Sequence, residues 1–156
     1  MAYLDIITLA EAKTYLRIDD TLTEDDAQIT RMINAALSQV EIATNYILFA
    51  RAKSYVVENL SVNVYDYPIN SLTTPTTATS VEKSIYTTYK TIVSTDLKVT
   101  LNVGYTTPSD VPSDLVEVAY EMIDLMYYSP ETGKSIKSDL SELSKMVLSN
   151  YKRFFI

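Results

Sequence analysis

The chain has 156 residues, 47% of them hydrophobic and 21% charged, which is enough to build one domain with a substantial core. Its formal net charge of −7 excludes a protein that holds nucleic acid through a basic face, although DNA can pass such a surface without being held. It has no cysteine and no histidine, which excludes disulfides, thiolate chemistry, Cys/His zinc sites and imidazole general bases. No secretory signal is predicted at its start, so we expect synthesis in a cytoplasm.

Two helices are predicted in the first third of the chain. Thr8 and Glu11 have the spacing of a capping box, so we expect a short helix that runs through Arg17. Thr23 then precedes three acids, which the positive end of a helix dipole favours. Apolar residues follow at spacings of three and four, which predicts a long helix over 24–48. They are Ile29, Met32, Ile33, Ala36, Leu37, Val40, Ala43 and Ile47.

From Arg51 the apolar residues alternate with polar ones, and this period of two predicts strands. The stretch 70–80 is rich in Thr, Ser and Pro and is predicted to be an exposed loop. Short strand-like runs follow at 81–86 and 91–93, and we expect them to pair in antiparallel fashion with a strand at 97–103. Together these segments form a β and loop insertion over about 51–103.

A nearly all-apolar helix is predicted over 112–128. Gly104 ends the preceding strand, and Pro112 suits the first helical position because its missing N–H is not needed there. Only one narrow stripe of the helix is acidic, made of Glu117, Glu121 and Asp124. Two interpretations remain open: the helix is the core of one subunit, or it also contacts a second subunit. For the second case the predicted interface residues are Tyr120, Ile123, Tyr127 and Tyr128.

The last predicted helix spans 138–151. Ser138 is its expected cap, and Leu140, Leu143, Val147 and Tyr151 form its expected apolar face. A short tail of two basic and three apolar residues follows, and we expect it either to pack on the core or to dock on a partner. The tail consists of Lys152, Arg153, Phe154, Phe155 and Ile156.

No catalytic, cofactor-binding or metal-binding residue is predicted. The acids around Asp19 and Asp26 lack the glycine and the spacing of a calcium loop, and helix starts account for them. Glu117 and Glu121 place two carboxylates on one helix face, an arrangement that a carboxylate-dependent hydrolase uses. No histidine accompanies them, as a di-iron bundle requires, so a solvated stripe is the competing interpretation.

The predicted fold class is therefore α+β, mainly α: a helical bundle of helices 24–48, 112–128 and 138–151 with a small antiparallel β element. The order of several short motifs resembles the phage head–tail connector (adaptor) proteins of the gp6-like family. The matching residues are Ile7–Lys13, Leu16–Asp20, the acid-opened long helix, Pro68–Leu72, Gly104-Tyr105 and Val111–Leu115. This resemblance spans most of the chain, with its weakest match after Ser129.

The resemblance implies a single connector domain over 1–156 and a closed ring of about a dozen subunits, the symmetry type of a head-to-tail assembly. Such a ring lies in the neck of a virion, beneath the portal vertex, extends the DNA channel without specific DNA binding and catalyses no reaction. Its implied partners are the portal protein, through residues 152–156, and stopper or tail proteins. No membrane is involved.

Three alternatives remain at this point. The chain is a stopper or tail-completion protein of the same neck, a hydrolase that uses Glu117 and Glu121, or an interaction module unrelated to virions. The first differs from the connector in which neighbour it binds. The second requires the two carboxylates to be free for chemistry.

Overall fold

The structure is a computed structural model and describes residues 2–74, 79–82, 90–128 and 139–152. Its described residues form two compact units. Unit 1 contains Met1–Thr44 and Thr107–Lys152, and unit 2 contains Asn45–Thr106. The predicted insertion over 51–103 lies inside unit 2, while the idea that the whole chain acts as one connector domain stays a prediction.

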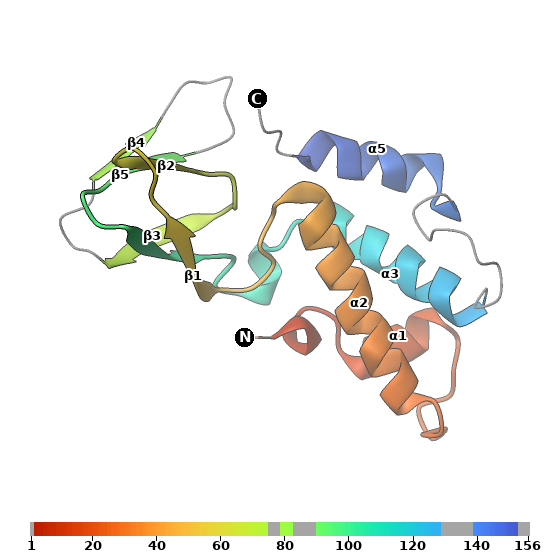
Figure 1. Ribbon diagram of the computed structural model, residues 1–156. Helices are drawn as coiled ribbons and strands as arrows, with labels where there is room; N and C mark the ends of the chain where they lie inside the picture. Colours follow the sequence, from red (N-terminus) through yellow and green to blue (C-terminus); the bar gives the residue numbers. More distant parts are fainter. Residues whose placement is uncertain (1, 75–78, 83–89, 129–138, 153–156) are drawn as a thin grey trace. The chain divides into compact units, whose positions relative to one another are not determined.

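Unit 1 is helical. Its α-helices are α1 (Leu9–Tyr15), α2 (Asp26–Thr44), α3 (Ser113–Tyr128) and α5 (Glu142–Tyr151), with short 3-10 turns at Tyr3–Asp5 and Pro108–Asp110. Helices α2 and α3 pack against each other, and both contact α1 and α5 (Figure 1). Fully buried aliphatic side chains such as Leu37 and Leu115 form the core between them. Among the described residues, no helix is long and apolar enough to cross a membrane.

The start of α1 confirms the capping box. The Glu11 N–H donates to Thr8 Oγ1 over 3.2 Å, and the Thr8 N–H donates to Glu11 Oε2 over 2.8 Å. These two bonds satisfy backbone donors that the first turn of a helix leaves without partners. The bond from the Thr8 N–H and a further bond from the Thr8 hydroxyl, both to Glu11 Oε2, lower the pKa of Glu11, because a carboxylate that accepts hydrogen bonds is stabilised in its charged form.

The long helix was predicted to extend to 48, which is wrong, because α2 ends at Thr44. Asn45 has φ +61°, a left-handed conformation that asparagine tolerates and that commonly ends helices. Ile47 then donates its N–H to the Tyr67 carbonyl over 2.7 Å. The apolar periodicity continued past the helix because Ile47 is buried in the core of unit 2 instead.

Unit 2 consists of two three-stranded antiparallel sheets. The first has the order β1 (Arg51–Val56), β6 (Lys98–Val103) and β3 (Ile69–Thr74). The second has the order β2 (Ser61–Val64), β5 (Lys90–Val93) and β4 (Thr79–Glu82). Both sheets contribute to one core of buried side chains, and Figure 1 shows them as neighbours. This core contains Ile47, Val57, Val64, Ile92, Val99, Leu101 and Val103.

Two predictions for this region are wrong. The stretch 70–80 is not a loop where it is described, because β3 extends to Thr74 and β4 begins at Thr79. Threonine fits a strand well, and the partner that makes β3 a strand is β6, about thirty residues later. Strand β5 pairs with β2 and β4 rather than with β6, whose neighbours are β1 and β3. The remainder of the predicted 81–86 run, from 83 on, lies outside the described residues.

Gly104 occupies the end of β6, as predicted. Its φ is +104°, and a β-carbon there would lie 2.2 Å from the Phe49 carbonyl oxygen. Glycine is therefore required for close packing as well as for its backbone conformation. The Gly104 N–H donates to the Pro68 carbonyl over 2.8 Å, and the Tyr105 N–H donates to the Ile47 carbonyl over 3.2 Å. These bonds join the end of β6 to the segments that contain Pro68 and Ile47.

Helix α3 begins one residue after the predicted start, with the Pro112 carbonyl accepting from Leu115. Helix α5 is shorter than predicted, since it begins at Glu142 and its cap is Ser141, whose side chain accepts from the Ser144 N–H. Ser138 lies outside the described residues. Leu140 is buried as predicted, but Leu143 is exposed, and Leu148 is the buried leucine of α5. The fold class, α+β and mainly α, is confirmed.

Candidate functional site

The four predicted interface residues of α3 make contacts within their own subunit, and their role at a subunit interface stays a prediction. Ile123 is fully buried, so it presents no surface to a neighbour. Tyr120 is partly buried and stacks on Tyr15 of α1, with ring centroids 4.8 Å apart and planes 19° from parallel. This aromatic stack ties α1 to α3.

The two tyrosines at the end of α3 hold the segment between α1 and α2. The Tyr127 hydroxyl donates to Asp25 Oδ2 over 2.7 Å. The Tyr128 hydroxyl donates to the Leu16 carbonyl over 2.6 Å. Tyr128 is 60% exposed, so of the four residues it offers the most surface to a partner. Sequence periodicity identified these residues as amphipathic contacts but did not distinguish contacts within the subunit from contacts between subunits.

The acidic stripe of α3 does not form a paired-carboxylate centre. Glu121 Oε1 accepts the Ser141 N–H over 2.5 Å, and Glu121 Oε2 accepts the Ser141 hydroxyl over 2.9 Å and the Ser144 hydroxyl. Burial alone raises the pKa of Glu121, but the hydrogen bonds from Ser144 and Ser141 outweigh it and hold the pKa below its ordinary value. The Glu121 carboxylate therefore accepts hydrogen bonds from the first turn of α5 and links α5 to α3.

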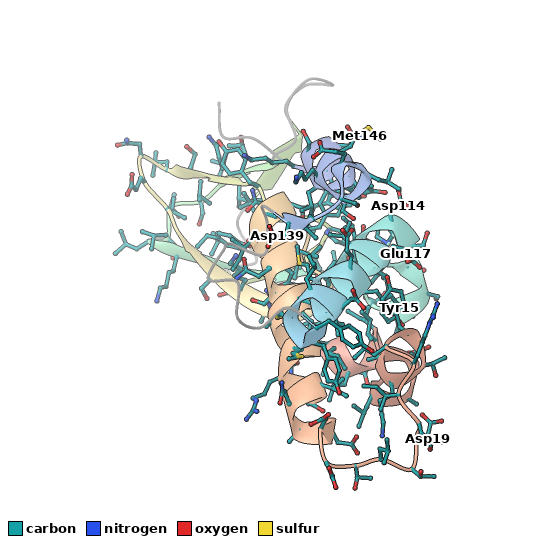
Figure 2. All side chains as sticks on the ribbon, turned by 90° about the vertical axis from the view of Figure 1, so that its right-hand side faces the viewer. Tyr15, Asp19, Asp114, Glu117, Asp139 and Met146 are labelled. Carbon is teal, nitrogen blue, oxygen red and sulfur yellow. The ribbon has the colours of Figure 1, made fainter. Side chains whose placement is uncertain are left out.

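Glu117 and Asp124 lie on either side of Glu121 along the same face. Figure 2 shows Glu117 on α3 with Tyr15 of α1 near it. Burial raises the pKa of the Tyr15 hydroxyl, and the charges of Asp124 and Glu117 raise it further. These carboxylates therefore line a surface beside the tyrosine stack. Among the described residues no group of His, Cys, Asp or Glu is arranged to hold a metal ion.

Sequence reasoning missed a buried lysine. Lys13 of α1 has a side chain only 4% exposed, and its Nζ lies 2.9 Å from Asp26 Oδ1. The same Nζ donates to the carbonyls of Asp20 and Leu22 over 3.1 and 2.5 Å. The signal was present, because Lys13 lies four residues after Leu9 and three before Leu16, on the apolar face of the helix. Two acids of the segment 19–26 therefore have structural partners, Asp26 in the Lys13 ammonium group and Asp25 in the Tyr127 hydroxyl.

The predicted portal-binding tail is described only at its first residue. Lys152 follows α5 and is exposed. Arg153, Phe154, Phe155 and Ile156 lie outside the described residues. Their role therefore stays a prediction.

The chain is similar in sequence to a known protein family and in fold to solved structures. A family model described as "Phage gp6-like head-tail connector protein" matches residues 6–96. No curated protein matches the chain significantly. A chain of the native gene transfer agent virion is similar in fold, with a TM-score of 0.74, 15% identity, and coverage of 100% of this chain and 94% of that one.

Two further similar structures are described as necks of the same kind of particle. One, from the native particle computed with C12 symmetry, has a TM-score of 0.72 and 13% identity. The other, from the empty particle computed with C6 symmetry, has a TM-score of 0.71 and 15% identity. Each match covers 100% of this chain and 94% of the other chain. At these identities the likeness concerns the fold, whereas the family model concerns the sequence and spans more than half of the chain. The protein therefore belongs to the phage gp6-like head–tail connector family.

Proposed function

We propose that about a dozen copies of this chain assemble into a closed ring of the virion neck, beneath the portal vertex, where the ring joins head to tail and extends the DNA channel. The observation that carries this proposal is the family match over residues 6–96. It is supported by the similarity of the whole chain to a chain of a neck computed with C12 symmetry.

The electrostatics suit a channel protein that DNA passes without being held. The chain has 20 acidic and 13 basic side chains, and it lacks the excess of positive charge by which proteins neutralise phosphates. A negative wall repels the DNA backbone, so transit is not slowed by specific contacts.

The proposal includes no catalytic activity. The best candidate pair for a hydrolase was Glu117 and Glu121, and Glu121 is occupied by three hydrogen bonds from the start of α5. Its lowered pKa favours the charged form, the opposite of what a general acid needs at neutral pH. A structural role explains these contacts without further assumptions.

We further propose that residues 152–156 contact the portal protein and that the opposite side of the ring receives stopper or tail proteins. Two cations followed by three apolar residues provide both charge attraction and apolar area for such a contact. The second candidate function, a stopper or tail-completion protein, differs in its neighbour: a stopper binds the connector ring rather than the portal.

The test is a binding measurement between this protein and the portal protein of the same phage. We expect the full chain to co-sediment with portal rings and a variant lacking residues 152–156 to remain unbound. Circular dichroism of that variant should match the full chain, because α5 itself and the capping contacts at its start are retained and only the bond from the Lys152 N–H to the Ser149 carbonyl at its end is lost. If the full chain binds an assembled connector ring but no portal, the stopper assignment replaces this one.

A further inference from the structure

One end of unit 2 carries two paired backbone segments, 57–60 and 94–97. The Val57 N–H donates to the Leu97 carbonyl over 3.0 Å, and the Ser94 N–H donates to the Leu60 carbonyl over 3.1 Å. Exposed aliphatic side chains gather on these segments and the residues beside them. We call this group the β tip, and it consists of Val56, Leu60, Val93 and Leu97. Leu97 is the most exposed of them, at 83%.

Leu60 has a backbone conformation that leucine disfavours. The hairpin between Glu58 and Ser61 is closed by N–H to carbonyl bonds in both directions, at 3.1 and 3.0 Å. Its two central residues, Asn59 and Leu60, have φ +52° and +65°. A turn with two positive φ values normally places glycine second, since a β-carbon is strained there. The Leu60 side chain is 62% exposed, so burial within the subunit does not explain why this position holds a leucine.

A second exposed apolar group lies on unit 1. Leu143 and Met146 are 67% and 55% exposed and lie three residues apart, so they are neighbours on the surface of α5. We call these two residues the α5 face. Figure 2 shows Met146 at the outer side of the helix.

We propose that the β tip of one subunit packs against the α5 face of the next copy. This inference rests on the ring proposed above. A closed ring is built from contacts between two different surfaces of the same chain, and the chain presents two such apolar groups on different units.

The size of the β tip suits a contact with a neighbouring copy in a ring. Its four side chains expose on the order of 400 Å², the size of the largest apolar patches on monomeric proteins. A stable complex of two proteins buries about 800 Å² on each partner, so this contact is too small to hold an isolated dimer. In a closed ring every subunit makes the contact twice, once with each neighbour, so small contacts are sufficient together.

Cysteine cross-linking tests the contact directly, because the natural chain contains no cysteine. The double variant with Leu60→Cys and Met146→Cys should form, on mild oxidation, a ladder of covalent oligomers in non-reducing gels. Each single variant should stay monomeric in the same gel. The control pairs Leu60→Cys with Ile42→Cys, another exposed aliphatic position outside both surfaces, and should give no ladder.

The outcomes separate this inference from the ring itself. The experiment is run on the free protein and on protein assembled with its portal, with native mass spectrometry reporting whether rings form. Rings without a ladder in the double variant overturn the inference and leave the ring standing. Dimers of the Leu60→Cys single variant show a tip-to-tip contact and also overturn it. No ladder in either preparation overturns it whether or not rings form.

A second variant separates folding from docking. Leu60→Gly relaxes the turn, so the melting temperature should rise by about 2–4 °C. The same change removes an apolar contact, so the subunit concentration for half-assembly should rise by about tenfold or more. Asn59→Gly is the matched control, since it also places a glycine in this turn but keeps the leucine, and its half-assembly concentration should not rise. Unchanged assembly of Leu60→Gly would place the leucine outside the interface.

Discussion

Replacement of Lys13 by methionine should destabilise unit 1 by about 3 kcal/mol. Methionine has a similar length and fills the same space, so the change removes the charge and the donors rather than the packing. The lost contacts are those to Asp26 Oδ1 and to the carbonyls of Asp20 and Leu22, at 2.9, 3.1 and 2.5 Å. Removing one partner of a buried ion pair costs about 3–5 kcal/mol. We expect the low end, because the side chain of Asp26 is 29% exposed and regains part of its hydration.

The measurement is equilibrium unfolding in urea, followed by helical circular dichroism and by tyrosine fluorescence, since the chain has 13 tyrosines and no tryptophan. Two probes are needed because two compact units need not unfold in one transition. Lys145→Met is the matched control. Its ion pair with Glu142 is at the surface, so its loss should change the free energy of unfolding by less than about 0.5 kcal/mol. A Lys13→Met cost as small as that of the control would refute the reasoning, because it would mean that the buried contacts contribute nothing net.

Three further predictions follow from single contacts. The folded pKa of Glu121 lies below its ordinary value, so its stabilising contribution is present above about pH 4.5 and is lost as the pH falls through the folded pKa. Glu121→Gln should therefore be less stable than the natural chain at pH 7 by about 1–2 kcal/mol in urea unfolding, with the gap closing toward pH 3; Glu117→Gln should show no such gap. Gly104→Ala should lower the free energy of unfolding by more than about 3 kcal/mol or prevent folding of unit 2, because the alanine β-carbon would meet the Phe49 carbonyl. Retained β-strand circular dichroism with an unchanged melting temperature would contradict this. Tyr127→Phe should lower the free energy of unfolding by about 1 kcal/mol through loss of the bond to Asp25, and a double-mutant cycle with Asp25→Asn checks that the two effects are not additive.

The features that the sequence predicted correctly depend on neighbouring residues. The Thr8 capping box, the start of α3 within one residue of Pro112 and the end of β6 at Gly104 are all determined within a few positions of the chain. The long helix was also predicted correctly in its centre, where side chains at spacings of three and four form its buried face.

The features that the sequence did not predict depend on distant partners. Strand β3 was missed because its polar residues become a strand only by pairing with β6. The end of α2 was missed because apolar residues continue beyond Asn45 into a different core. For α3, the pattern showed which residues are apolar, but not that Ile123 would be buried by its own subunit. The role of Glu121 was hidden because its donors lie twenty and more residues away on α5.

Native mass spectrometry of the purified chain over a range of concentrations, with and without its portal protein, tests the central claim most directly. The account predicts a closed oligomer of about a dozen copies, formed cooperatively and without a stable dimer on the way. A chain that stays monomeric at every concentration, and that neither oligomerises on the portal nor binds it, would contradict the account.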